Sequence, residues 1–352
     1  MANKSNTAFT PTVAIPPGET IAENIASLGL NQQELAKRLG ISEKHLSHII
    51  NGKAPITYET ALGLEKTIGP SAQFWLNLES NFQLHLARLR NEASMEKELD
   101  VLRNIPYKEM ANLNWVTATK NKAEQIQESR SYYGVSNLTL IEDSYQVAFR
   151  KQKQLGPISD LGVIAWLRKA ELDGIHMNTL DFASKNLEAT IPELRNLSTA
   201  PIDQVIPILQ KICSECGIAL VVLPYLAKTY ICGATIWRKK KPIVAISSRG
   251  KRIDTFWFTL FHEFAHLLLH GVNHIHIHYE HDAEDEANAL ATDLLVPDDL
   301  YRDFVEKRPY QQKQEITGFA RSVGVAPGII VGRLQHDGLL AHSSHRDLLE
   351  LR

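Results

Sequence analysis

Hydrophobic and polar positions alternate with two different periods along this chain, and the pattern predicts a mainly helical protein with a small β-sheet. Residues 256–269 are apolar almost all round, which is typical of a buried helix. Residues 284–295 have apolar positions three and four apart and stop before Pro297, so a second packed helix is expected there. Residues 233–237 and 242–246 are short apolar runs around a basic turn, the pattern of a β-hairpin. The sequence therefore predicts an α+β fold.

Near the other end of the chain, residues 31–52 have the spacing of two short helices that pack against each other. The apolar positions that would form their contact are Leu35, Ala36, Leu39, Ile41, Leu46 and Ile49. Gly40 permits a tight turn between the helices, and Ser42 is placed to cap the second one. This pattern predicts a helix-turn-helix whose second helix enters the major groove of double-stranded DNA. The alternative is a helical hairpin that only packs.

The polar positions of this motif supply the candidate DNA-binding residues. Those on the second predicted helix, facing bases or backbone, are Glu43, Lys44, His45, Ser47 and His48. Gln33 and Lys53 are placed to hold phosphates. Between residues 31 and 53 there are four Lys and Arg against two Glu, so the affinity of one copy is expected to be modest. We therefore expect a homodimer, which doubles the contacts with an operator.

The buried helix carries the residues with the clearest chemistry, His262, Glu263 and His266. Two histidines four residues apart project from one helix face and can reach a single tetrahedral ion. Burying them without partners is costly, so a metal ion is expected, with hydrogen-bonded core histidines as the alternative. On the second helix, Glu284 falls roughly 60° from the centre of the apolar face and Glu286 roughly 100°. Glu284 is therefore the preferred third ligand, and Glu286 the alternative.

Three protein ligands leave one position of a zinc ion open for water, which is the mark of a catalytic site. Zinc lowers the pKa of that water towards roughly 7, and Glu263 can take its proton and deliver it to a leaving amine. The predicted reaction is peptide hydrolysis. The hairpin could offer an edge strand to an extended substrate, or it could be an ordinary packed hairpin.

Residues 256–266 (Phe-Trp-Phe-Thr-Leu-Phe-His-Glu-Phe-Ala-His) and 284–297 together resemble the ImmA/IrrE metallopeptidase family, over roughly residues 200–340. The resemblance implies a gluzincin-type zinc site that cleaves a regulatory protein, often a repressor bound to DNA. By position it implies His262, His266 and Glu284 as zinc ligands and Glu263 as the base. Val296 stands where the family usually has Met, a difference of packing.

Roughly residues 15–90 resemble the HigA family of toxin–antitoxin antidotes, within the larger Xre and lambda-repressor-like class. Besides the helix-turn-helix, the resemblance rests on residues 56–62 and on Phe74-Trp75-Leu76-Asn77-Leu78-Glu79. It implies a lambda-repressor-like helical domain, operator binding that is usually autoregulatory, and pairing with a ribonuclease toxin.

Length and composition fit a composite chain. With 352 residues and 44% hydrophobic content we expect a helix-turn-helix domain over 1–90, a helical connector or sensor over 91–200 and a zinc peptidase domain over 201–352. A net charge of −2 excludes a wholly basic protein that coats nucleic acid. The three cysteines cannot all pair, and no apolar run is long enough to span a bilayer or to form a signal peptide. We expect a cytoplasmic protein without a membrane partner.

The sequence thus predicts a DNA-binding transcriptional regulator with a zinc-dependent endopeptidase domain that cleaves a partner repressor or itself. The alternative is a HigA-like antitoxin that represses its own operon and neutralises a ribonuclease toxin, with the zinc domain as a scaffold or sensor. A transcription factor with a proteolytically silent metal domain is a third hypothesis. All three predict binding to an operator.

Overall fold

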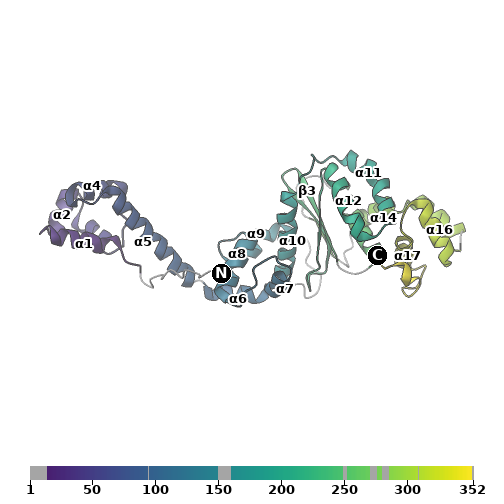
Figure 1. Ribbon diagram of the computed structural model, residues 1–352, viewed down its shortest axis with the longest axis horizontal. Helices are drawn as coiled ribbons and strands as arrows, with labels where there is room; N and C mark the ends of the chain where they lie inside the picture. Colours follow the sequence, from purple (N-terminus) through teal and green to yellow (C-terminus); the bar gives the residue numbers. More distant parts are fainter. Residues whose placement is uncertain are drawn as a thin grey trace, which may run out of the picture. The chain divides into compact units, whose positions relative to one another are not determined.

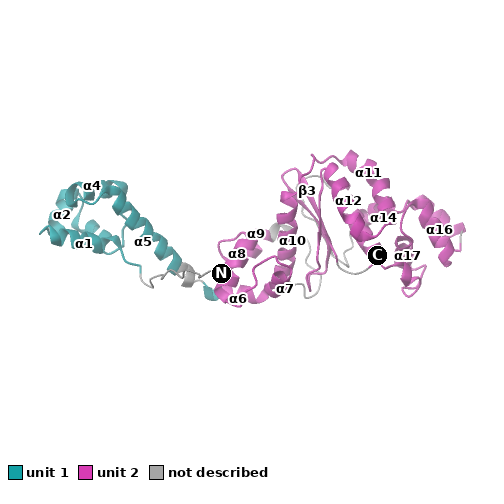
Figure 2. Cartoon of the chain, viewed as in Figure 1, with its two compact units in different colours: residues 1–97 teal, residues 98–352 magenta. Residues whose placement is uncertain are grey.

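The chain folds into two compact units, residues 1–97 and 98–352 (Figure 2). The computed structural model describes residues 14–93, 95–149, 160–248, 252–269, 276–279, 285–307 and 309–350. The predicted class, mainly α with a small β-sheet, is confirmed (Figure 1). Within these ranges, no helix is both long and apolar enough to cross a membrane.

The first unit is a helical bundle around one small core. Its helices are α1 (Pro17–Ser27), α2 (Gln32–Leu39), α3 (Glu43–Ile50), α4 (Tyr58–Ile68) and α5 (Ala72–Ala93). The core contains Ile21, Leu35, Leu46, Leu64 and Trp75, all fully buried. The indole Nε1 of Trp75 donates a hydrogen bond to the backbone oxygen of Pro70 at 3.0 Å, so burying this ring leaves its polar atom satisfied.

The turn between α2 and α3 is the one that the sequence predicts. Gly40 ends α2 with φ 69°, a left-handed conformation that glycine adopts without steric cost. Ser42 caps α3, since its side chain accepts a hydrogen bond from the backbone N–H of His45 at 3.1 Å. At the start of α2, Asn31 and Glu34 form a reciprocal capping box. These caps define both ends of α2 and the start of α3 from local sequence alone.

The second unit contains a small sheet with helices before and after it. The segments that precede the sheet are α6 (Met95–Asn104, which begins in the first unit), α7 (Tyr107–Asn112), α8 (Lys122–Tyr133), a 3₁₀ turn (Leu138–Leu140), α9 (Ile141–Phe149), α10 (Asp160–His176), α11 (Ser184–Leu197) and α12 (Ile202–Glu215). The strands are β1 (Ala219–Leu223), β2 (Ile231–Arg238), β3 (Lys241–Ser247) and β4 (His276–Tyr279). The remaining segments are α13 (Ile253–Leu269), α14 (Asp285–Leu295), α15 (Asp298–Lys307), α16 (Lys313–Val323), α17 (Pro327–His336) and a 3₁₀ turn (Arg346–Leu348).

The four strands lie in the order β1-β3-β2-β4. The predicted hairpin is confirmed, because β2 and β3 pair antiparallel from Gly233↔Ile246 to Arg238↔Lys241. Lys239 turns the chain between them with φ 57°. The expectation that this hairpin offers an edge strand is wrong: β1 pairs in parallel with β3, and β4 pairs antiparallel with β2. Both hairpin strands are therefore interior strands of the sheet.

Helices cover both faces of the sheet, because alternate side chains of a strand point in opposite directions. On one face, a Cβ at Gly174 of α10 would lie 2.5 Å from the side chain of Ile243. On the other face, Thr235 of β2 contacts Glu263 of α13. α10 lies on one side of the strands and α12 on the other (Figure 1). Within residues 91–200, the range expected as a helical connector or sensor, α10 belongs to the same compact unit as α13.

Candidate functional site

α13 places two imidazoles together inside the second unit. His262 is fully buried and His266 is 3% exposed, because the helix is apolar on nearly every side. The histidines lie one helical turn apart, and their Nε2 atoms are 3.0 Å from each other. Their ring centroids are 4.6 Å apart with the planes at 85°. The structure therefore brings together the first two predicted metal ligands.

This arrangement fits a zinc ion in both chemistry and spacing. Imidazole nitrogens are ordinary zinc ligands, at about 2.0–2.1 Å. A tetrahedral angle at that length places two such nitrogens about 3.3 Å apart, close to the separation of the two Nε2 atoms. Two histidines whose Nε2 atoms face each other at this distance match the first two corners of such a site.

The preferred third ligand, Glu284, lies outside the described residues. α14 begins at the next residue, Asp285, and packs along α13. The alternative, Glu286, has an exposed side chain on α14. Within the ranges that the structure describes, no group of three or more potential metal ligands occurs.

Glu263, the predicted base, lies between the two histidines in the sequence. Its side chain is fully buried. Its Oε2 accepts a hydrogen bond from Thr235 Oγ1 at 2.7 Å, so β2 orients the carboxylate. A Cβ at Gly233 would lie 2.7 Å from Glu263 Oε1 and 2.7 Å from Thr259 Cγ2. The backbone of β2 can approach α13 this closely only because residue 233 has no side chain.

Sequence reasoning missed both Gly233 and Thr235. The available signal was Gly233 itself, because glycine inside an apolar strand often marks a close approach of another group. What could not be read was the partner, since Thr235 and Glu263 are 28 residues apart. Their contact depends on how α13 packs over the sheet.

The cysteines of the second unit are core residues. Cys213 is 1% and Cys216 4% exposed, and both belong to the cluster of apolar side chains around α12 and α13. Burial raises the pKa of the Cys213 thiol, which disfavours the thiolate that metal binding or redox chemistry requires. Both side chains therefore serve the packing of α12.

The first unit exposes the predicted DNA-binding residues. α3 buries Leu46 and Ile49 against the core and turns its opposite face outward. Ser47 is half-buried, with its Oγ 3.4 Å from Asn51 Nδ2. The other candidates are all exposed: Gln33, Glu43, Lys44, His45, His48 and Lys53. The side chains of α3 are thus available to a major groove, the position expected of a recognition helix.

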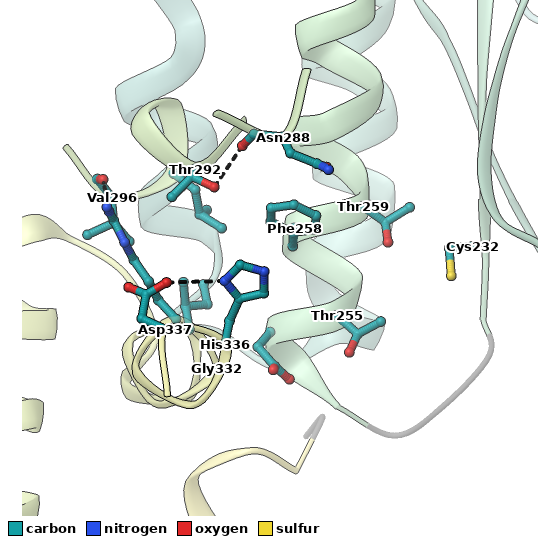
Figure 3. A pocket seen from close by; sticks show the side chains of 14 residues that line it. Cys232, Thr255, Phe258, Thr259, Asn288, Thr292, Val296, Gly332, His336 and Asp337 are labelled. Atoms are coloured by element: carbon teal, nitrogen blue, oxygen red, sulfur yellow. Dashed lines mark hydrogen bonds and ion pairs between the residues drawn. The ribbon is translucent and has the colours of Figure 1, made fainter. Parts of the chain in front are cut away.

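A pocket of about 420 Å³ lies between β2, α13, α14 and α17 (Figure 3). Its lining includes Phe258 and Thr259 of α13 and Asn288 and Thr292 of α14. His336, at the end of α17, points toward the middle of the view, below Phe258 (Figure 3). The sequence did not predict this pocket, because its walls come from segments that are distant in sequence, from Cys232 to Asp337.

Two known protein families match separate parts of the chain. A sequence model of helix-turn-helix domains matches residues 21–74. A model of the IrrE N-terminal-like domain, a peptidase family, matches residues 213–335. The first match spans α2 and α3, and the second spans the sheet, α13 and α14.

Individual relatives resemble a quarter of the chain. An uncharacterised HTH-type transcriptional regulator of Escherichia coli K12, YddM, is 36% identical over 87 residues, which are 25% of this chain and 84% of the regulator. The solved structure of an addiction module antidote protein of the HigA family from Coxiella burnetii is 36% identical, covering 24% of this chain and 92% of that one, with a TM-score of 0.22. The Pseudomonas aeruginosa antitoxin HigA, solved with the higBA promoter, is 29% identical over 24% of this chain and 94% of its own, with a TM-score of 0.23.

Proposed function

We propose that the chain is a DNA-binding transcriptional regulator with a zinc-dependent endopeptidase domain. Its N-terminal part belongs to the helix-turn-helix regulators. Residues 213–335 match the IrrE N-terminal-like domain, which supports the peptidase half of the proposal. The substrate of the endopeptidase domain is a regulatory protein, either a partner repressor or the chain itself. One observation carries the peptidase half: two buried imidazoles meet at 3.0 Å on the helix that also holds a buried carboxylate.

In this proposal His262, His266 and Glu284 hold the zinc ion. The buried pair supports the first two assignments. The exposure of Glu286 supports Glu284, since a ligand has to point toward the buried histidines. Bound zinc supplies Lewis acidity, which polarises a peptide carbonyl and makes water more acidic.

Glu263 acts as the general base and then as the general acid. Its carboxylate takes a proton from the attacking water and delivers it to the nitrogen of the leaving amine. The hydrogen bond from Thr235 fixes Oε2, so the carboxylate keeps one orientation during both transfers. Complete burial keeps bulk water from competing for the proton.

The first unit binds an operator through α3 as a homodimer. Glu43, Lys44, His45, Ser47 and His48 face the major groove, while Gln33 and Lys53 hold phosphates. The exposed face of α3 supports this assignment. A dimer is proposed because one helix of this size makes few contacts, and two half-sites double them. Such a regulator acts in the cytoplasm.

The peptidase assignment is tested by comparing the wild-type chain with Glu263→Gln and His262→Ala. Zinc content after dialysis is measured by mass spectrometry. Proteolysis is measured with a peptide library as the substrate. We expect the wild type to bind one zinc and cleave, Glu263→Gln to bind zinc but lose at least about 100-fold in kcat/KM, and His262→Ala to lose both. Cleavage by Glu263→Gln at the wild-type rate would show that the base is another residue.

A second candidate function is supported by the likeness to antidotes. The Coxiella burnetii protein, 36% identical over 92% of its length, is described as an addiction module antidote. By analogy, this chain would repress its own operon and neutralise a ribonuclease toxin, with the zinc domain as a scaffold or sensor. Coexpression with the product of the adjacent gene distinguishes the two: relief of toxicity by residues 1–97 alone, without proteolysis, favours the antidote.

A further inference from the structure

The pocket in Figure 3 is lined by residues of α13 that lie within one helical turn of His262. Phe258 lines the pocket, and its ring centroid is 6.1 Å from that of His262, one helical turn away. Thr259 also lines it, and a Cβ at Gly233 would lie 2.7 Å from both Thr259 Cγ2 and Glu263 Oε1. A peptide held at the histidines would therefore place an adjacent side chain within reach of this pocket.

The walls of the pocket favour an uncharged occupant. They combine apolar groups with hydroxyls: Cys232, Thr255, Phe258, Thr259, Thr292, Leu295, Val296 and Ile329. About 420 Å³ is room enough for an aromatic ring or a large aliphatic side chain.

The charged groups at the pocket already have partners. Asp254 pairs with Arg252 at 2.7 Å. Arg333 donates to the backbone oxygen of Val296 at 2.6 Å, and its guanidinium lies 3.7 Å over the Tyr301 ring. Asp337 accepts from Tyr301 at 2.7 Å and lies 3.1 Å from His336, which is mostly exposed at the rim. A charged occupant would lose hydration without gaining a free counter-ion.

Asn288 adds a polar requirement to the pocket. Its Oδ1 is buried, and no donor among the residues that the structure describes reaches it. A buried acceptor without a donor costs free energy, so an occupant that donates a hydrogen bond there is favoured. A peptide backbone N–H next to an apolar side chain meets both requirements.

We propose that this pocket is the specificity pocket of the chain, and that it takes a large uncharged side chain, aromatic or aliphatic, from the residue flanking the scissile bond. Asn288 Oδ1 accepts the backbone N–H beside that side chain. The assignment rests on the proposed peptidase function, and it names the class of sequence that the peptidase cleaves.

The test fills the pocket from its exposed side. Thr255 lines it, and its side chain is exposed, so Thr255→Phe narrows the pocket without burying a new ring in a packed core. Thr317→Phe on α16 is the matched control, because Thr317 does not line the pocket. Each full-length protein, loaded with zinc, is given peptides that carry Phe, Ala or Asp on either side of the cleaved bond.

We expect the wild type and Thr317→Phe to prefer Phe over Ala at one flanking position by at least about tenfold in kcat/KM, and to reject Asp. In Thr255→Phe the ratio of Phe to Ala should fall at least about tenfold, while zinc content stays the same. An unchanged ratio in Thr255→Phe, or a preference for Asp, would overturn the assignment.

If no peptide is cleaved, a binding measurement tests the pocket instead. The probe is N-acetyl-phenylalanine amide, followed by ligand-observed NMR on the full chain without zinc, with N-acetyl-aspartate amide for comparison. Selective binding of the phenylalanine probe to the wild type and to Thr317→Phe, but not to Thr255→Phe, supports the pocket even though the peptidase proposal has failed. Equal binding to all three proteins, or to none, overturns it.

Discussion

At the scale of single residues, the centre of the second unit buries polar side chains, although burying apolar side chains there would cost less free energy. His262 and Glu263 are fully buried and His266 nearly so. Their identity as a set could be predicted, because the spacing of the two histidines is local and α13 is recognisably apolar. The contacts that orient them could not, since Thr235 and Gly233 reach Glu263 from a strand that is distant in sequence.

The third zinc ligand is tested by comparing Glu284→Gln with Glu286→Gln. We expect Glu284→Gln to lose zinc on dialysis, because an amide is a poorer ligand than a carboxylate. Glu286→Gln should keep zinc, since the side chain of Glu286 is exposed. Zinc per chain, measured by elemental mass spectrometry, decides between them. Zinc retained by Glu284→Gln and lost by Glu286→Gln would reverse the assignment.

The hydrogen bond of Thr235 should contribute measurably to stability. Thr235→Val removes the donor to a buried carboxylate oxygen, and we expect the zinc-free protein to lose about 1–3 kcal/mol in free energy of unfolding. Thr235→Ser keeps the hydroxyl and should recover much of that loss. Urea unfolding followed by tryptophan fluorescence measures both variants. A loss in Thr235→Ser without a loss in Thr235→Val would mean that the methyl group matters and the hydrogen bond does not.

At the scale of elements, periodicity predicted α13, α14 and the β2–β3 hairpin, because each depends on residues close in sequence. It did not place the hairpin inside the sheet. The parallel partner β1 precedes β2, and the antiparallel partner β4 follows α13, so neither pairing leaves a local pattern. The helix-turn-helix, including its capping residues, could be predicted from local sequence, since Gly40 ends α2 and Ser42 caps the start of α3.

The close approach of β2 and α13 can be tested at Gly233. Gly233→Ala puts a Cβ 2.7 Å from Glu263 Oε1, and we expect a loss of about 1–3 kcal/mol together with weaker zinc binding. Gly318→Ala in α16 is the control, because its Cβ would meet nothing within 4 Å and alanine favours a helix. Calorimetric unfolding and zinc titration provide the measurements. Wild-type stability in Gly233→Ala would show that the strand is free to move away.

The role of α3 can be tested through the salt dependence of operator binding. Lys44→Ala should weaken binding and, if Lys44 contacts a phosphate, reduce the slope of log K against log salt concentration by about 1. Lys307→Ala, an exposed lysine on α15, should leave the slope unchanged. Fluorescence anisotropy with labelled operator DNA gives both slopes. Equal effects of the two substitutions would show that α3 is not part of the DNA interface.

At the scale of the whole molecule, one chain joins a unit that matches helix-turn-helix domains to a unit that matches the IrrE N-terminal-like peptidase family. A protein bound to the same operator would meet the peptidase at a raised effective concentration, so we expect proteolysis to be faster when operator DNA is present. The modest net charge of −2 fits this division, because only the small first unit needs to attract DNA. In our proposal, the pocket lined by Phe258 and Asn288 and the proteins bound to the same operator together determine which protein is cleaved.

The most direct test of the central claim is intact-mass spectrometry of the chain and the products of its neighbouring genes, incubated with zinc and operator DNA. Wild type and Glu263→Gln are compared side by side. We predict that wild type releases fragments of one of these proteins, cut beside a large uncharged residue, and that Glu263→Gln releases none. The same fragments in both samples, or none in the wild type with zinc confirmed bound and operator present, would contradict the claim.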